Sequence, residues 1–249
     1  MSMTELLHLP TLSSNGAMNM ALDEVLLDAA NNANQPMLRF YGWATPTVTL
    51  GYFQPVADRL ARTGIAELAW VRRPTGGATL VHDSRHEFTY ALALPEKFAT
   101  APDAANWICL MHYLIRDALA SLGVQARAVV CGEEARLGPV LCFQHQTPGD
   151  LLIAGSKVAG SAQRKVRGAI LQHGSVALSQ SPYTPELPGV LELAGKQLLA
   201  EDVQTQLLQQ FTKRLNWSIR TIDWRKEWIE EARLRDVGKY STAEWNAKR

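Results

Sequence analysis

Two arginines and two glycines form the first stretch whose residue types could bind a ligand. Arg72 and Arg73 precede Gly76 and Gly77 in RRPTGGATLVHD, and Ala78 and His82 follow. Glycine permits close approach of a ligand to the backbone, and arginine suits an anionic or carbonyl-bearing group. A hairpin turn with solvated arginines is the alternative. The combination favours a site, and it matches neither common nucleotide-binding loop, GxxxxGK[ST] or GxGxxG.

Lys157 lies in a second stretch, GSKVAGSAQR, which is rich in small residues. After a tight turn its ammonium could be directed into a groove, and Gly160, Ser161 and Ala162 would leave room there for a ligand. A solvated lysine in a hairpin turn explains the residue types equally well.

Cys142 and His173 are the remaining candidates for chemistry. A nucleophilic cysteine needs a nearby cation or helix N-terminus to become a thiolate, and most free cysteines are inert core residues. The core interpretation holds for Cys109 and Cys131. For Cys142, followed by Phe143 and lying shortly before Lys157, both interpretations stay open. His173, in LQHGS, is expected to be a hydrogen-bonded histidine beside the site rather than a base.

Aromatic residues gather between positions 40 and 53. Tyr41, Trp43 and Phe53 could wall a pocket for an aliphatic chain, or they could belong to an ordinary core. A chain bound there would lie between the 40–53 and 72–81 strands.

The pattern of apolar residues predicts one α+β domain over 1–249. Helices are expected at 17–30 after the cap Asn15, at 104–122 after Asp103, from 202 to about 215, and from Asp223 to about 237. The C-terminal helices, about 202–237, should pack on the domain. Strands are expected at 67–73, 78–82, 87–94, 126–131, 139–143, 150–154, 157–162 and 168–178, with two more in 37–50 joined by a tight turn. Residues 179–200 should form a loop with at most a short helix.

Composition narrows the class of protein. The 249 residues include 25 basic and 24 acidic ones, which gives a net charge of +1. This small charge argues against binding to nucleic acid or to an anionic membrane through overall electrostatic attraction. The three cysteines lack metal-ligand spacing, which predicts a reduced protein without a metal. No signal peptide or membrane span is apparent, so we expect a cytoplasmic protein.

Taken together, these stretches resemble the biotin/lipoate protein ligase family, in its octanoyltransferase and lipoate–protein ligase branch. The resemblance also includes NMALD at 19–23, RFYGW at 39–43, GYFQ at 51–54 and KYSTAEWN at 239–246, in family order over nearly the whole chain. It implies a single catalytic domain with a central mixed β-sheet flanked by helices, related to class II aminoacyl-tRNA synthetase cores.

The family attaches a medium-chain acyl group to one lysine of a lipoyl domain or of the glycine-cleavage H protein. One class of transferases places its nucleophile in a Cys-Phe pair shortly before the lysine stretch, and Cys142-Phe143 matches that position. The region 176–190 has no cysteine, which disfavours another transferase class, and Ala78 replaces a glycine common in the family, which weakens the case for ATP chemistry. The resemblance therefore implies an octanoyltransferase that takes octanoyl or lipoyl from acyl carrier protein through acyl-Cys142, without a cofactor.

The alternatives are an ATP- and Mg²⁺-dependent lipoate–protein ligase that forms a lipoyl-adenylate, a lipoyl-domain amidotransferase, and a catalytically silent binding module. The catalytic residues implied are Cys142 and Lys157. The substrate-binding residues expected are Arg72, Arg73, Gly76, Gly77, Ala78, His82, Gly160, Ser161, Ala162, His173, Tyr41 and Trp43.

Overall fold

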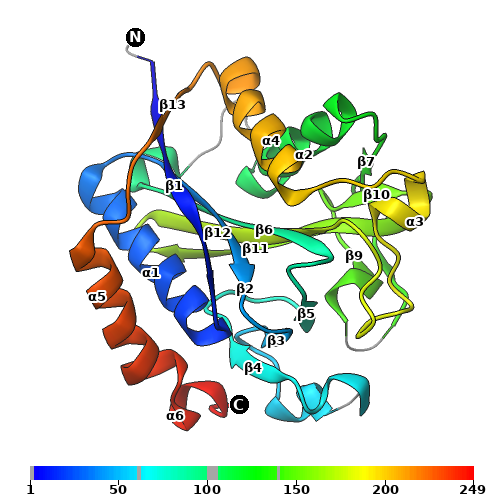
Figure 1. Ribbon diagram of the computed structural model, residues 1–249, viewed down its shortest axis with the longest axis horizontal. Coiled ribbons are helices and arrows are strands. Elements are labelled where there is room, and N and C mark those ends of the chain that lie inside the picture. The colour runs from blue at the N-terminus through cyan, green and yellow to red at the C-terminus, as the bar shows by residue number, and fades with distance from the viewer. Residues whose placement is uncertain (1–2, 61–62, 100–105, 139–140) are drawn as a thin grey trace.

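A mixed eight-stranded sheet forms the centre of the computed structural model, which describes residues 3–60, 63–99, 106–138 and 141–249. The strand order is β13-β1-β2-β6-β12-β11-β10-β7 (Figure 1). These strands are β1 (Glu5–Ser14), β2 (Met37–Trp43), β6 (Glu87–Leu94), β7 (Arg127–Ala128), β10 (Leu151–Ile153), β11 (Ser156–Val166), β12 (Ala169–Ala177) and β13 (Ser218–Thr221). β1 pairs in parallel with β2 and β13, and the other neighbours pair antiparallel. As expected, both halves of the chain contribute to the sheet.

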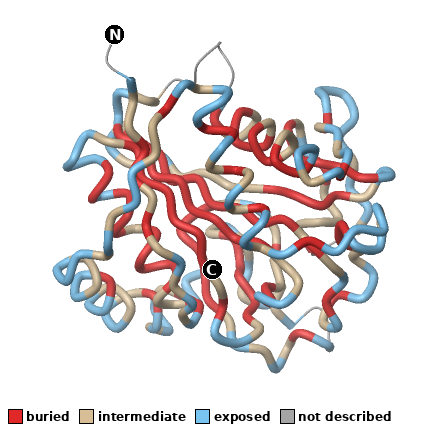
Figure 2. The backbone as a smooth tube through the Cα atoms, turned by 45° about the horizontal axis from the view of Figure 1, so that its top comes forward, coloured by how far each residue is buried: buried red, intermediate tan, exposed pale blue. Residues whose placement is uncertain are grey.

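Two layers of helix cover the sheet. Helices α2 (Trp107–Ser121) and α4 (Ala200–Leu215) lie on one face, and α1 (Gly16–Ala33) and α5 (Lys226–Arg235) lie on the other (Figure 1). Buried residues follow the central strands and the inner sides of these helices (Figure 2). Each fully buried Leu, Val, Ile or Phe contributes roughly 1.5–3 kcal/mol relative to an exposed one, so burial of these side chains stabilises the sheet that carries the site.

A smaller sheet carries the arginine and glycine stretch. β3 (Thr47–Leu50) lies between β4 (Ala69–Arg72), which is parallel to it, and β5 (Leu80–His82), which is antiparallel. As expected, residues 37–50 form two strands with a short connection, but the strands do not pair with each other: β2 pairs with β1 and β6, whereas β3 belongs to the second sheet. The chain around Pro46 therefore passes from one sheet to the other, and the two sheets can enclose a space between them.

Helix ends follow local capping chemistry. The Asn15 side chain accepts a hydrogen bond from the Met18 amide at 2.8 Å, which confirms the predicted cap of α1. Asn106 caps α2 in the same way, and the predicted cap Asp103 lies outside the described residues. Asp223 does not cap α5, which begins at Lys226 after Arg225.

The rest of the chain forms short elements. The 179–200 segment contains the short helix α3 (Val190–Ala194), as expected, and a π-helical turn (Asp236–Tyr240) and α6 (Ala243–Asn246) follow α5. β8 (Ala135–Arg136) pairs with β9 (His145–Gln146). Single 3₁₀ turns occupy Val56–Leu60, Thr63–Ile65, Glu96–Phe98 and Cys142–Gln144. Within the described ranges, no helix has the length and apolar character needed to cross a membrane.

The segment around Cys142 differs from the expected strand at 139–143. Cys142–Gln144 form a 3₁₀ turn, and Leu141 makes only an isolated parallel bridge with Thr79. The Cys142 amide donates to the Thr79 carbonyl at 2.7 Å. This contact fastens the cysteine turn to the loop that begins with the two arginines.

Candidate active site

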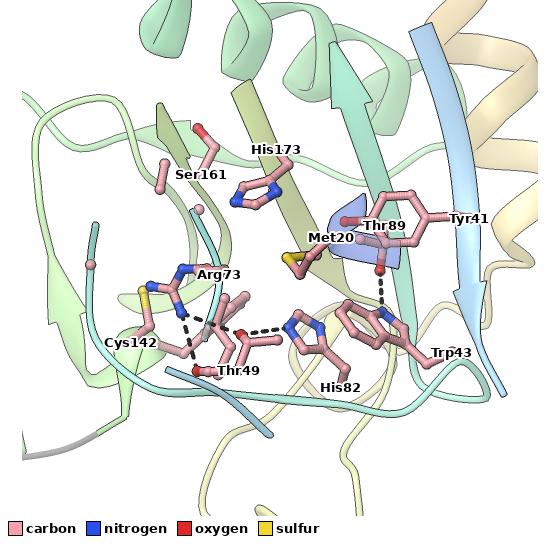
Figure 3. Close-up of a pocket in the computed structure, with 16 residues that line it drawn as sticks. Met20, Tyr41, Trp43, Thr49, Arg73, His82, Thr89, Cys142, Ser161 and His173 are labelled. Carbon is pink, nitrogen blue, oxygen red and sulfur yellow. Dashed lines mark hydrogen bonds between the residues drawn. The ribbon is translucent and has the colours of Figure 1, made fainter. Parts of the chain in front are cut away.

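A pocket that opens to solvent lies where the small sheet meets the central sheet. The lining side chains come from α1, from both sheets and from the cysteine turn (Figure 3). They are Met20, Tyr41, Trp43, Thr49, Arg73, Gly77, Leu80, His82, Thr89, Cys142, Phe143, Gly160, Ser161, Ala162, His173 and Gly174.

The aromatic part of the pocket is held rigidly. The Trp43 ring stacks on the His82 ring with centroids 3.9 Å apart, and its indole N–H donates to Thr89 Oγ1 at 3.2 Å. The His82 ring nitrogens contact Glu87 Oε1 at 2.8 Å and Thr49 Oγ1 at 3.0 Å. Fixed aromatic walls of this kind suit an aliphatic chain better than a charged ligand.

Arg73 places a buried positive charge in the pocket wall. Its guanidinium donates to the carbonyls of Thr49 at 3.1 Å, of Gly76 at 2.7 Å and of Ala78 at 2.8 Å. No carboxylate within the described part of the chain pairs with it. Burial lowers the pKa of Arg73 to about 10, so the group stays protonated near neutral pH. In Figure 3 the Cys142 sulfur points toward this guanidinium.

Lys157 brings a second cation to Cys142. Its ammonium lies 4.0 Å from the Cys142 sulfur and 2.9 Å from the His145 carbonyl oxygen. It also forms an ion pair with Asp150 at 2.7 Å, and only 3% of each side chain is exposed. Lys157 is therefore not the solvated lysine of the alternative interpretation, because a buried carboxylate neutralises and holds its ammonium.

Glycine at position 160 makes room for the lysine itself. A Cβ at Gly160 would lie 2.6 Å from Lys157 Cε and 2.8 Å from its Nζ. The small residue therefore serves the packing of Lys157, while Gly160, Ser161 and Ala162 also line the pocket.

His173 belongs to a buried polar chain at the side of the pocket. Its Nδ1 lies 2.7 Å from Asp23 Oδ2 and its Nε2 lies 2.6 Å from Thr75 Oγ1. Arg39 forms a buried ion pair with Asp23 at 2.7 Å. Burial raises the pKa of Asp23, but Arg39 and His173 outweigh burial and hold it below 3.8. Both ring nitrogens of His173 are engaged, as the interpretation of a hydrogen-bonded residue beside the site requires.

The structure brings most of the predicted site residues together. Arg73, Gly77, Tyr41, Trp43, His82, Cys142, Gly160, Ser161, Ala162 and His173 all line the pocket. Lys157 lies behind it, in contact with Cys142. Gly76 and Ala78 contribute carbonyls to Arg73 rather than a lining surface. Phe53, expected as a wall, is 68% exposed.

Arg72 lies outside the pocket. Its guanidinium donates to the carbonyls of Gly51 at 2.9 Å, of Gln54 at 2.6 Å and of Asn246 at 3.0 Å. The Asn246 side chain accepts from the Arg72 amide at 2.8 Å. Arg72 thus ties the 51–54 loop to α6.

Some lining residues were not anticipated. Met20, Leu80, Phe143 and Gly174 lie within the quoted motifs but were not singled out, and Thr49 and Thr89 reach the pocket from strands whose sequences look like ordinary core. Asp150 is the most important residue that the sequence analysis did not identify, because its carboxylate holds the Lys157 ammonium in place. It stood in the stretch GDLLIAGSKVAG, and a carboxylate before an antiparallel strand pair is the signal that could have marked it.

The described residues include no group of three or more His, Cys, Asp or Glu side chains arranged to hold a metal ion. The polar groups in and directly behind the pocket include a thiol, two cations and hydrogen-bonded histidines. This set suits acyl transfer through a thiolate.

Comparison with known proteins gives a consistent result. Residues 15–184 match the model of the lipoyl protein ligase A/B catalytic domain. An octanoyltransferase LipM of Halalkalibacterium halodurans is 31% identical, over 94% of this chain and 95% of its own. An octanoyltransferase LipM of Bacillus subtilis is 29% identical, over 94% of each chain.

Solved structures share the fold. A Thermoplasma acidophilum protein described as a lipoate protein ligase with bound lipoic acid superposes with a TM-score of 0.79 at 22% identity, over 98% of this chain and all of its own. A lipoate-protein ligase A bound with ATP gives 0.77 at 24% identity, over 98% of this chain and 99% of its own. The expected α+β fold with a central mixed sheet is confirmed.

Proposed function

The chain belongs to the lipoyl protein ligase A/B catalytic domain family, and we propose that it is an octanoyltransferase that works through Cys142. It takes an octanoyl or lipoyl group from acyl carrier protein and gives it to one lysine of a lipoyl domain or of the glycine-cleavage H protein. The observation that carries the proposal is the Cys142 thiol, which lines the pocket with the Lys157 ammonium 4.0 Å from its sulfur.

In the first step the Cys142 thiolate attacks the thioester carbonyl of the donor. A bond forms between the sulfur and the acyl carbon, the donor C–S bond breaks, and the donor thiolate leaves and takes up a proton. Arg73 and Lys157 stabilise the negative charge on sulfur and on the carbonyl oxygen. One thioester replaces another, so the step needs no ATP.

In the second step the neutral amine of the acceptor lysine attacks acyl-Cys142. A C–N bond forms, the C–S bond breaks, and the amine loses one proton while Cys142 returns as the thiolate. The same two cations stabilise the oxyanion and the departing thiolate. An amide is more stable than a thioester, so this step drives the transfer forward.

The pocket supports an acyl chain as the group transferred. Aromatic and apolar side chains form its walls, and its cations lie around the sulfur, where the acyl carbonyl must be. The ATP-dependent ligase shares the fold, but no specific feature of the described residues favours it over the thiolate mechanism.

The test is the intact mass of the protein after incubation with octanoyl–acyl carrier protein in the absence of ATP. We expect a mass gain of one octanoyl group that hydroxylamine removes. Cys142→Ser should show no gain, because a hydroxyl is far harder to ionise than a thiol near neutral pH. Cys109→Ser and Cys131→Ser are matched controls and should acylate normally.

Other outcomes point to other activities. Octanoyl transfer by a folded Cys142→Ser variant without ATP would refute the covalent mechanism. Modification of a lipoyl domain only when ATP and free lipoate are supplied would establish the ligase. Acylation from an octanoylated lipoyl domain, and not from the carrier protein, would establish the amidotransferase.

A further inference from the structure

Three cationic side chains gather over two aromatic rings beside the pocket. The Lys248 ammonium lies 3.8 Å from the centre of the Tyr52 ring, and the Arg249 and Arg164 guanidinium carbons lie 5.6 Å and 5.8 Å from it. Arg249 also lies 5.3 Å from the centre of the Phe53 ring. We call Arg164, Lys248, Arg249, Tyr52 and Phe53 the cationic patch.

The cationic side chains of the patch are not paired with acidic side chains of the described residues. None of the ion pairs between described residues includes Arg164, Lys248 or Arg249. The pKa of Tyr52 is lowered, first by a hydrogen bond from Lys248 and further by the charges of Lys248, Arg164 and Arg249. A chain with a net charge of only +1 therefore concentrates unpaired cations at one place.

The patch also exposes an apolar surface. Phe53 is among the most exposed large apolar residues in the described chain, at 68%, and lies beside the Arg249 guanidinium. An exposed aromatic ring framed by cations is typical of a surface that binds an acidic protein partner.

One loop separates the patch from the pocket. The Tyr52 amide donates to the Thr75 carbonyl at 2.8 Å, and Arg164 reaches the Pro74 carbonyl at 3.4 Å. The Phe53 ring packs beside Gly76, while Gly77, the next residue, lines the pocket. A partner seated on the patch is thus one loop away from the pocket that holds Cys142.

We propose that the cationic patch is the docking surface for the acidic carrier protein that donates the acyl group, an inference that rests on the proposed function. A carrier protein presents its acyl thioester on a flexible arm joined through a phosphodiester, so its attachment point is anionic. The reactive group of the acceptor is instead a lysine, which carries no negative charge for the patch to attract. Charge complementarity therefore assigns the patch to the donor.

The test separates the two half-reactions and two donors. The rate of Cys142 acylation is measured by intact mass with octanoyl–acyl carrier protein and with octanoyl-N-acetylcysteamine, which is uncharged and has no protein. The variants are Lys248→Glu/Arg249→Glu, the neutral Lys248→Gln/Arg249→Gln, and the control Lys196→Glu/Lys213→Glu. The control reverses two exposed lysines on or just before α4, which is well separated from α6 (Figure 1).

We expect the double charge reversal to lower kcat/KM for the carrier protein about tenfold at low salt, and the neutral variant to lower it less. The difference from wild type should shrink in ~0.5 M salt because the charges are then screened. Acylation by octanoyl-N-acetylcysteamine, the melting temperature and the control variant should be unchanged.

Three results would overturn the proposal. Equal losses with both donors would mean that the variant damages the pocket. An unchanged rate with the carrier protein would mean that the patch does not bind it. Normal acylation with slow transfer from acyl-Cys142 to a lipoyl domain would assign the patch to the acceptor. Failure of the wild-type protein to acylate with either donor would instead refute the proposed function, and the docking inference with it.

Discussion

Replacing Lys157 by alanine should harm both stability and catalysis, because the ammonium has two separate neighbours. Lys157→Ala leaves the Asp150 carboxylate buried, and its remaining hydrogen-bond partners among the described residues are the Thr147 amide and hydroxyl, at 2.7 Å and 2.9 Å. Breaking a buried ion pair costs about 3–5 kcal/mol. Since those two hydrogen bonds remain, we expect a loss of about 3 kcal/mol, which for a chain of this size is a fall in melting temperature of roughly 6–12 °C.

The loss of activity in Lys157→Ala has a different cause from the loss of stability, and a second substitution separates the two. Removing the cation 4.0 Å from the Cys142 sulfur should slow acylation ~10²–10³-fold, the cost typical of losing one oxyanion donor. The double variant Lys157→Ala/Asp150→Asn removes the buried unpaired charge, so it should recover most of the melting temperature and none of the rate.

The assays are thermal unfolding and the rate of acyl-Cys142 formation by intact mass. A Lys157→Ala protein as stable as wild type would refute the assignment of Asp150 as its buried partner. A double variant that recovers the rate along with the stability would show that Lys157 acts only through the fold.

Three further substitutions test the loop at Gly77, the strand β11 at Gly160 and the buried carboxylate of Asp23. Gly77 has a φ of +93°, and a Cβ there would lie 2.8 Å from Arg73 Nη2. Gly77→Val should therefore lower the free energy of unfolding by about 1–3 kcal/mol and slow acylation of Cys142. A wild-type acylation rate would contradict the placement of the Arg73 guanidinium. Gly160→Ala should displace Lys157, reduce acylation by tenfold or more and lower the melting temperature by less than Lys157→Ala does, because the ion pair with Asp150 is shifted rather than removed; an unchanged rate would show that the displaced lysine still acts on Cys142. The pKa of Asp23 is lower in the folded protein than its ordinary value of 3.8, so its contribution to stability is complete above that pH and is lost as the pH falls through the folded value. Urea unfolding between pH 5 and 2 should therefore show a shallower loss of stability in Asp23→Asn, and identical slopes would contradict this.

Local patterns predicted much of the fold. The 3–4 residue spacing of Met18, Leu22 and Val25 after Asn15 identified α1, because both the apolar face and the cap are encoded within one short segment. The strand β6 and the loop character of 179–200 were also local properties.

Long-range pairing was not predictable in this way. β1 contains Pro10 and shows no clear alternation, and β13 is only four residues long. Their parallel pairing joins Glu5 to Ser218, and nothing in either segment alone indicates the other. Pairing between segments so far apart depends on the whole sheet.

For the site, too, local patterns were predictable from the sequence and long-range contacts were not. The residue types of RRPTGG, GSKVAGS and LQHGS identified the pocket, because unusual combinations of cations and glycines have few structural explanations. The ion pair of Lys157 with Asp150 and the approach of Arg73 to Cys142 depend on how β10, β11 and the small sheet meet. Sequence spacing does not encode those distances.

The link between Arg72 and α6 constrains the order in which the protein can become active as it is made. Arg72 holds the 51–54 loop, but it is itself held by Asn246, and the Trp245 indole donates to its carbonyl at 2.8 Å. A ribosome releases residues 51–77 long before it releases residues 245–246. The loop beside the pocket therefore takes its final arrangement only when residues 245–246 have emerged, and a nascent chain with Cys142 already outside the ribosome still lacks a finished site.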